Sequence, residues 1–324
     1  MHKAKIKEYE VNINFKHDQY SNCIQDIFIT YLNWKKYSYF KLFDHTWSFS
    51  FKSNGPDGWG IDTYRNGFTQ LFESLYYNFG INLKFYNDLS DEDRTLGVMS
   101  QELEEGRIVG LEIDPYYCEW HRVYRKYHSN HFVLITGISK EYLICIDPYT
   151  SDLPKRMPFK LFFQGAKKIF LIAEEISVEY DWQKNMYKNL NNIFVGSQNM
   201  SDFEQMRKFS DYIDEVRIKN EVDKYDSMVF YPLLLRLNNV GDSRRSYSSY
   251  LDYLMTIQWD INFSKYSEEL IKASRLWSET GALMLKYILS DYNKVIRKKL
   301  KAKIINISET EEAIANELLC QIRP

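Results

Sequence analysis

The sequence predicts an α+β domain followed by an all-α domain. Its 324 residues suggest two domains, at roughly 100 to 200 residues each. Over about the first 175 residues, helical patterns precede a group of strands, an order that favours an α+β fold over alternating βαβ units. After about residue 180 nearly every pattern is helical. We therefore expect domains at residues 1–178 and 179–324.

The N-terminal domain is predicted to begin with helices. Apolar residues such as Ile24, Phe28 and Tyr31 recur at helical spacing, which places Cys23 in the first turn of a buried helix. Residues 48–60 have a loop-like composition, with a turn signal at 54–58. A second helix is expected from about residue 63 to 79, where Gly80 ends it.

Strands are predicted to follow. Residues 81–86 alternate like a strand, and 91–105 have a helical pattern. Three further strands are expected, at 108–113, 131–138 and 142–146. The last two are separated by three residues, which is a hairpin-length connection. A strand at 168–173 is expected to complete the sheet.

The C-terminal half carries helix signals. Two segments, Ser201 to Glu204 and Ser308 to Glu311, fit the capping box and predict helix starts near residues 202 and 309. Long amphipathic helices are expected between them, at 246–259 and 264–303. The second is expected to be interrupted near Gly281 or Asp291.

Composition excludes several classes of function. The 42 Lys and Arg residues nearly balance the 44 Asp and Glu residues, so no global field attracts nucleic acid. No apolar run approaches the roughly 20 residues that cross a bilayer, and no membrane partner is expected. The start of the chain lacks a secretory pattern, and the four cysteines are scattered. We expect a soluble, cytoplasmic protein with reduced thiols.

Three residues form a candidate catalytic group. His131 opens one predicted strand and Asp147 follows its hairpin partner, so pairing brings imidazole and carboxylate to the same end. A His oriented by a carboxylate is the base of a nucleophilic triad, and Cys23 at a helix start is the candidate thiolate. Taken singly, each is more often a packing residue; the combination favours catalysis. The other cysteines are predicted to be packing residues: Cys118, Cys145 and Cys320.

This pattern resembles a known family over about residues 15–175. The residues that carry the resemblance are Cys23, Gly106 to Val109, Asp114 to Tyr117, His131 to Val133, Gly137 and Asp147–Pro148. They are similar to the N-terminal domain of butirosin biosynthesis protein H, a papain-like family distantly related to the double-glycine leader peptidases of bacteriocin exporters. The second half resembles the helical domain often joined to it, through Arg244–Arg245 before Tyr250–Leu251 and through Trp277.

The resemblance implies an acyltransferase with a papain-like catalytic domain. An aminoacyl or peptidyl thioester on the phosphopantetheine arm of an acyl carrier protein would pass to Cys23, then to a small-molecule amine. His131 would act as general base and then acid, with Asp147 orienting its ring. Thioester exchange is nearly isoenergetic, and the acyl-enzyme stays reactive toward amines. The setting would be a nonribosomal peptide or antibiotic pathway, and no cofactor of the protein's own is implied.

The chain departs from the family pattern around the proposed pocket. Asn22 replaces the usual His before the cysteine, and residues 43–48 replace a Gly-rich stretch. The resemblance implies Trp47, Tyr116 and Tyr117 as substrate-binding residues. Papain-like enzymes complete the oxyanion hole with a Gln side chain shortly before the nucleophile. Two candidates are open: Gln19, of the usual residue type, and His17, at the usual spacing.

Other features leave alternatives open. Basic stretches at 121–126 and 294–303 suit an acidic carrier protein but also an ordinary solvated face. His121, His128 and His131 lack further metal ligands at suitable spacing, so no metal site is predicted. The competing functions are a cysteine peptidase or amidase, and a catalytically idle binding component of a biosynthetic assembly.

Overall fold

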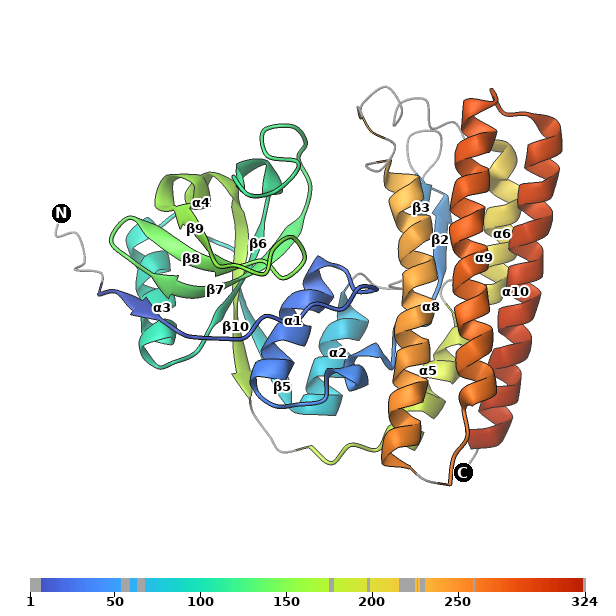
Figure 1. The fold of residues 1–324 in the computed structure, drawn as a ribbon, viewed down its shortest axis with the longest axis horizontal. Helices are drawn as coiled ribbons and strands as arrows, with labels where there is room; N and C mark the ends of the chain where they lie inside the picture. The colour runs from blue at the N-terminus through green and yellow to red at the C-terminus, as the bar shows by residue number, and fades with distance from the viewer. Residues whose placement is uncertain are drawn as a thin grey trace. The chain divides into compact units, whose positions relative to one another are not determined.

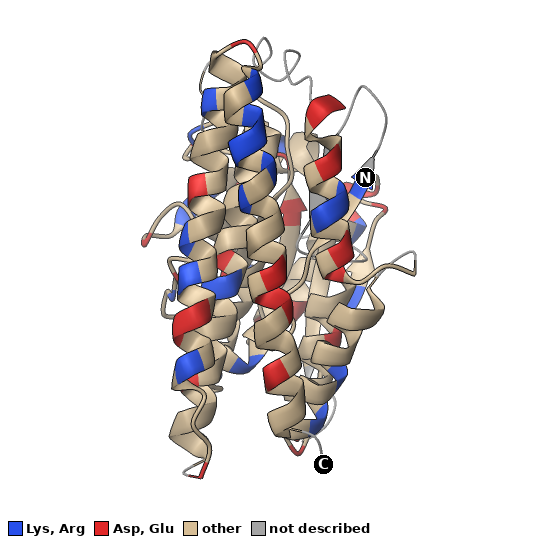
Figure 2. Ribbon diagram, turned by 90° about the vertical axis from the view of Figure 1, so that its right-hand side faces the viewer, with Lys and Arg blue, Asp and Glu red and all other residues tan. Residues whose placement is uncertain are grey.

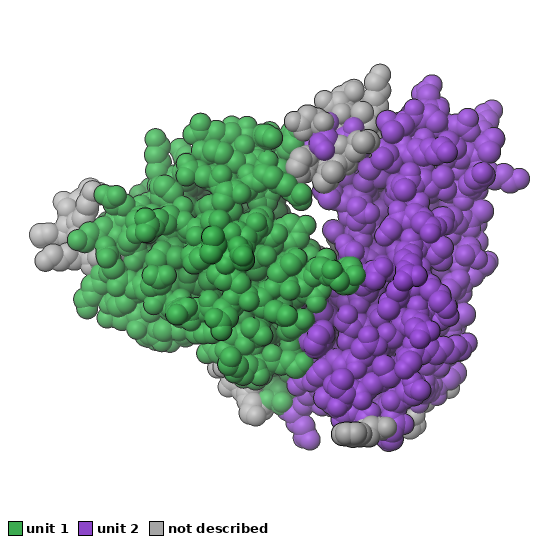
Figure 3. Space-filling view, in the orientation of Figure 1, with its two compact units in different colours: residues 1–39, 75–178 green, residues 40–74, 179–324 purple. Residues whose placement is uncertain are grey.

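The computed structural model describes residues 7–53, 59–62, 68–174, 178–196, 199–215, 225, 227, 231–258 and 260–322. The chain divides into two units, coloured separately in Figure 3. Unit 1 holds residues 1–39 and 75–178, and unit 2 holds 40–74 and 179–324. The predicted fold class is confirmed, because the large sheet lies in the N-terminal half and the described elements after residue 178 are helical.

Unit 1 is built on an antiparallel sheet (Figure 1). Its strands lie in the order β5 (Ile81–Tyr86), β10 (Ala166–Glu174), β6 (Val109–Ile113), β7 (His131–Ile138), β8 (Tyr142–Ile146) and β9 (Lys155–Pro158). The short strand β1 (Tyr9–Glu10) pairs with the far end of β7. The predicted bounds of β5, β7 and β8 agree with the structure, whereas β1, β9 and the short helix α4 (Phe159–Gly165) were not predicted.

Helices cover both faces of this sheet. Ile169 of β10 joins the apolar cluster that contains Leu96 and Met99 of α3 (Glu92–Glu104). The next residue, Phe170, instead contacts Phe28 of α1 (Cys23–Trp34). Because successive strand residues point to opposite faces, α3 and α1 lie on opposite sides of the sheet.

The Phe170 ring requires a glycine on the neighbouring strand. It lies over Gly110 of β6, and a Cβ at that position would come within 2.0 Å of the ring carbon Cε2. Gly110 therefore admits the aromatic ring on which α1 packs. This local requirement fixes the distance at which α1, and Cys23 with it, can approach the sheet.

Unit 2 is mainly helical. Its helices are α5 (Trp182–Val195), α6 (Asp202–Tyr212), α8 (Pro232–Ile257), α9 (Ser264–Leu289) and α10 (Lys294–Ile322), with the three long ones side by side in Figure 1. The capping box at Ser201 and Glu204 is confirmed. The interruption near Asp291 is also confirmed: Asp291 and Tyr292 have positive φ between α9 and α10, while Gly281 lies inside α9.

Residues 40–74 belong to unit 2 and include a hairpin in place of the predicted loop. Strands β2 (Ser50–Ser53) and β3 (Trp59–Asp62) are paired, and the turn predicted at 54–58 lies outside the described residues. Helix α6 supplies acceptors for β2 and for the residue before it: Asp202 Oδ2 accepts the amide of Phe49 at 2.7 Å, and Gln205 Oε1 accepts that of Phe51 at 3.0 Å. The helix α2 (Thr69–Phe79) then leads the chain back to unit 1.

A buried ion pair lies at the centre of unit 2. Arg244 and Glu311 are both fully buried, with Nη2 and Oε2 2.7 Å apart. The indole N–H groups of Trp47 and Trp277 each donate to Glu311 at 2.8 Å. The helix start predicted at 309 is therefore wrong: α10 runs through Ser308, and Glu311 binds Arg244 instead of capping a helix.

Candidate active site

Cys23 is the first residue of α1, as predicted. Asn22 caps the helix: its side chain accepts the amide of Gln25 at 3.1 Å, and Gln25 Oε1 accepts the amide of Asn22 at 3.0 Å. Asn22 thus supplies the cap of the helix that begins at Cys23. The Cys23 thiol is half-buried, and it lies close enough to His131 to help raise the pKa of that imidazole.

His131 and Asp147 meet at the end of the hairpin, as predicted. Nε2 of His131 lies 2.8 Å from Oδ2 of Asp147, and both side chains are buried. Burial alone would lower the pKa of His131, but the hydrogen bonds to Asp147 and Cys23 outweigh it and raise the pKa to about 10. Burial works against ionisation of Asp147 too, yet hydrogen bonds, His131 foremost, lower its pKa. The arrangement favours an imidazolium held between a thiol and a carboxylate.

Two neighbours of this pair were missed as site residues by the sequence analysis. Trp120 donates its indole N–H to Oδ2 of Asp147 at 2.8 Å. His121 lies edge-on to His131, with ring centroids 4.7 Å apart. Burial and the positive charge of His131 lower the pKa of His121 to about 4, so it is neutral at physiological pH. The sequence held one clue to Trp120. It lies in a loop between two predicted strands, and a buried indole N–H needs a hydrogen-bond acceptor.

A second histidine–carboxylate pair lies just before the nucleophile. Nδ1 of His17 is 2.7 Å from Oδ2 of Asp26, which is fully buried one turn into α1. Asp26 also accepts the backbone amide of Asp18 at 3.2 Å and the hydroxyl of Ser21. Of the two candidate oxyanion donors, His17 is thus held by a buried carboxylate, while Gln19 is exposed in a turn.

The ring of Tyr149 lies near both His131 and His17. Its ring centroid is 6.3 Å from that of His131 and 6.4 Å from that of His17. The Tyr149 side chain is 39% exposed, and His17 is 46% exposed. This side of the site therefore faces solvent, although His131 itself is buried. Sequence reasoning did not single out Tyr149, because its position two residues after Asp147 matched no motif.

Tyr116 and Tyr117 lie in a short 3-10 helix, η2 (Pro115–Tyr117), after β6. Since Ile113 of β6 is paired with His131, this helix follows the strand end next to the proposed triad. Tyr116 stacks on His128, with centroids 4.2 Å apart, and His128 Nδ1 lies 2.6 Å from Asp114 Oδ2. Both tyrosines are half-buried.

Trp47 does not lie where a substrate-binding residue was expected. It belongs to unit 2, it is only 2% exposed, and its indole donates to Glu311. No surface of Trp47 is left for a substrate. We correct this prediction: residues 43–48 contribute to the packing of unit 2.

The remaining cysteines differ from one another. Cys118 and Cys145 are buried, and burial raises the pKa of both thiols well above the ordinary range. They fit their predicted packing role. Cys320 is exposed on α10, so its predicted packing role is wrong. It is an exposed thiol outside unit 1.

The two basic stretches also differ. Figure 2 shows basic residues gathered towards the start of α10 and acidic ones further along. Arg297 and Lys301 of this stretch form ion pairs with Asp214, at 3.1 and 3.2 Å. In the stretch 121–126, His121 is neutral, and the positive charges are Arg122, Arg125 and Lys126, all exposed.

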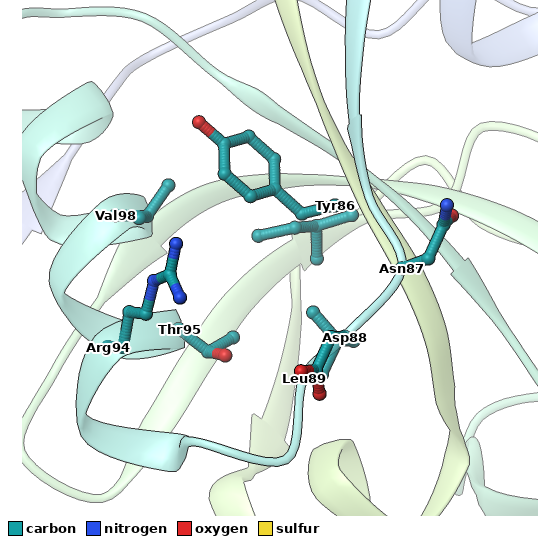
Figure 4. A pocket seen from close by; sticks show the side chains of 8 residues that line it. Tyr86, Asn87, Asp88, Leu89, Arg94, Thr95 and Val98 are labelled. Atoms are coloured by element: carbon teal, nitrogen blue, oxygen red, sulfur yellow. The ribbon is translucent and has the colours of Figure 1, made fainter.

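Other kinds of site receive less support. Among the described residues, no group of three or more His, Cys, Asp or Glu side chains is placed to hold a metal ion. No described helix combines the length and apolar character that crossing a bilayer demands. A small pocket between β5 and α3 is lined by Tyr86, Arg94, Val98 and their neighbours (Figure 4). Neither cysteine nor histidine is among its lining residues.

Comparison with known protein families gives a match to part of unit 1 and the start of unit 2. The family model described as butirosin biosynthesis protein H, N-terminal, matches residues 31–148. The matched segment includes His131 and Asp147 and begins after Cys23. No curated protein matches the chain.

Proposed function

From the match of residues 31–148 to the family model of butirosin biosynthesis protein H, N-terminal, we propose that the protein is a biosynthetic acyltransferase with Cys23 as its nucleophile. The observation that carries the proposal is that His131 lies 2.8 Å from Asp147, while both Asp147 and Cys23 raise the pKa of its imidazole. A thiol, an imidazole and a carboxylate in this order are the parts needed for transfer through a covalent acyl-enzyme.

The first step would take an acyl group from a carrier protein. The Cys23 thiolate attacks the carbonyl carbon of the thioester, and the C–S bond to the phosphopantetheine arm breaks. His131 gives its proton to the departing pantetheine thiolate, and Asp147 keeps the ring oriented. Since one thioester replaces another, the step is close to isoenergetic. An amine in place of water then takes the acyl group and forms an amide.

The carrier protein would approach unit 1 at residues 121–126. Carrier proteins generally present acidic surfaces, and the exposed Arg122, Arg125 and Lys126 follow directly after His121, which contacts His131. The basic start of α10 is a weaker candidate, because Asp214 already pairs with two of its residues. Opposite charges at this place would speed association and make it sensitive to salt.

The proposal is tested by trapping the intermediate. Incubation with an acyl-loaded carrier protein and no amine should leave the mass of the acyl group on the peptide that contains Cys23. Cys23→Ser should abolish this label, because a hydroxyl of far higher pKa is a poor substitute for a thiolate. Cys320→Ser is the matched control, since it removes an exposed thiol in unit 2 and should leave the label unchanged.

The outcomes separate the alternatives. Rapid loss of the acyl group to water, unaffected by added amines, would identify a hydrolase. Absence of the label, together with Cys23 reacting with iodoacetamide no faster than Cys320, would indicate an idle binding component. A label that persisted in Cys23→Ser would contradict the choice of nucleophile.

A further inference from the structure

The proton balance of the second transfer step requires two proton acceptors. This reasoning rests on the acyl-transfer function proposed above. An aliphatic amine arrives at neutral pH as an ammonium ion, R–NH₃⁺. It must lose two protons to become the N–H of an amide, while the C–S bond to Cys23 breaks and the thiolate departs. One proton returns to His131 and restores the imidazolium. The other needs a second base.

His131 is poorly suited to accept both protons. Its hydrogen bond to Asp147 persists in the acyl-enzyme and continues to favour the imidazolium. His121 adjoins His131, but burial keeps its pKa near 4, so it is a weak base. A second base should instead be a solvent-accessible histidine close to the nucleophile.

His17 meets these requirements. Its Nδ1 is held by the buried carboxylate of Asp26 at 2.7 Å, which leaves Nε2 as the ring nitrogen that can meet a substrate. Asp26 lies on α1, one turn after Cys23. The partly exposed Tyr149 is near both histidines, with its ring centroid 6.4 Å from that of His17 and 6.3 Å from that of His131.

We propose that His17, positioned by Asp26, is the general base that deprotonates the acceptor amine before it attacks the acyl group on Cys23. The acceptor would therefore enter along Tyr149, and its class is an amine that is protonated at neutral pH. His131 would thus serve the reaction with the carrier thioester, and His17 would deprotonate the amine. His17 would then pass its proton to solvent, to which it is exposed.

The test separates the two half-reactions. A small thioester of N-acetylcysteamine forms the acyl-enzyme without a carrier protein, and release of the free thiol reports acylation. Transfer is then measured to glycinamide, which is largely protonated at neutral pH, and to hydroxylamine, which is not. His17→Gln should slow transfer to glycinamide by about 10²- to 10⁴-fold. Acylation and transfer to hydroxylamine should change little.

The choice of Gln distinguishes a base from an oxyanion donor. A Gln amide can donate to an oxyanion but cannot accept the proton of an ammonium ion. If His17→Gln were as active as the wild type with both amines while His17→Ala slowed acylation, His17 would be an oxyanion donor and the inference would be overturned. Equal slowing of both amines by His17→Gln would also overturn it.

Two further variants complete the design. His128 also binds a carboxylate through Nδ1, at 2.6 Å from Asp114, and its side chain is 65% exposed, so His128→Gln is the matched control. Because His128 stacks on Tyr116, the control compares only the ratio of the glycinamide and hydroxylamine transfer rates, and this ratio should stay unchanged. Asp26→Asn should slow transfer to glycinamide less than His17→Gln does, provided that circular dichroism shows it folded. If the wild type formed no acyl-Cys23, the proposed acyl-transfer function itself would be wrong. If the wild type were acylated normally and His17→Gln transferred the acyl group to both amines at the wild-type rate, only the role of His17 would be wrong.

Discussion

Trp120 donates its indole N–H to the same carboxylate oxygen of Asp147 that holds His131. Asp147 is buried and charged, so each donor to it counts more than it would in water. In the proposed mechanism, Trp120 would therefore be a positioning residue that acts on the imidazole through the carboxylate.

We expect Trp120→Phe to lower the acylation rate about tenfold to a hundredfold. The loss of one hydrogen bond to a charged group corresponds to about 1.5 to 3 kcal/mol. Because Trp120 acts on the catalytic pair and not on the substrate, kcat should fall while KM is maintained. Trp182→Phe, an indole of unit 2, is the control. A change confined to KM would argue against this role.

The raised pKa of His131 predicts a pH-dependent stability. The folded-state pKa is about 10, above the ordinary 6.5, so the imidazolium stabilises the folded state fully below about pH 6.5. This contribution is lost as the pH rises towards 10. The fall in Tm between these limits should be smaller in His131→Gln than in the wild type. Parallel Tm curves for the two proteins would refute the assignment.

The ion pair at the centre of unit 2 should be sensitive to the loss of either partner. Arg244→Met leaves Glu311 buried without its cation, and we expect the free energy of unfolding to fall by about 3 to 5 kcal/mol. Lys265→Ala, which breaks an exposed pair with Glu317, should lower the free energy of unfolding far less, because solvent screens an exposed pair. Urea denaturation measures both, and similar losses would contradict the importance of burial.

Gly110 and Phe170 should behave as a coupled pair. Gly110→Ala places a methyl group against the Phe170 ring, and we expect destabilisation of about 1 to 3 kcal/mol. A smaller side chain at position 170 makes room, so Phe170→Leu combined with Gly110→Ala should be more stable than the sum of the single changes predicts. Strict additivity in a double-mutant cycle would show that the ring is not the obstacle.

Local patterns predicted the parts of the fold that depend on near neighbours. The hairpin of β7 and β8 follows from strand alternation around a three-residue connection, and it brings His131 and Asp147 together. The start of α1 at Cys23 follows from helical periodicity. These two elements supply the three proposed catalytic residues, which is why that group could be chosen from the sequence.

The features that the sequence analysis missed depend on residues far apart in the chain. Ser308 and Glu311 fit a capping box locally, but Arg244, 67 positions earlier, binds that carboxylate inside the core. Trp47 follows the first helix of unit 1, yet its hydrogen-bond acceptor is 264 positions away. Trp120 and Tyr149 matched no motif, because their relation to the site exists only once β7 and β8 are paired.

The assignment of residues 40–74 to unit 2 has a consequence for synthesis on the ribosome. Trp47 leaves the exit tunnel long before Glu311, its acceptor, has been translated. At roughly 5 to 20 residues per second, the delay is on the order of tens of seconds. Throughout that interval the nascent chain exposes an aromatic segment that includes Trp47, Phe49 and Phe51, all of which are buried in the finished protein. This segment is where we expect a chaperone that recognises exposed apolar chain to bind during translation.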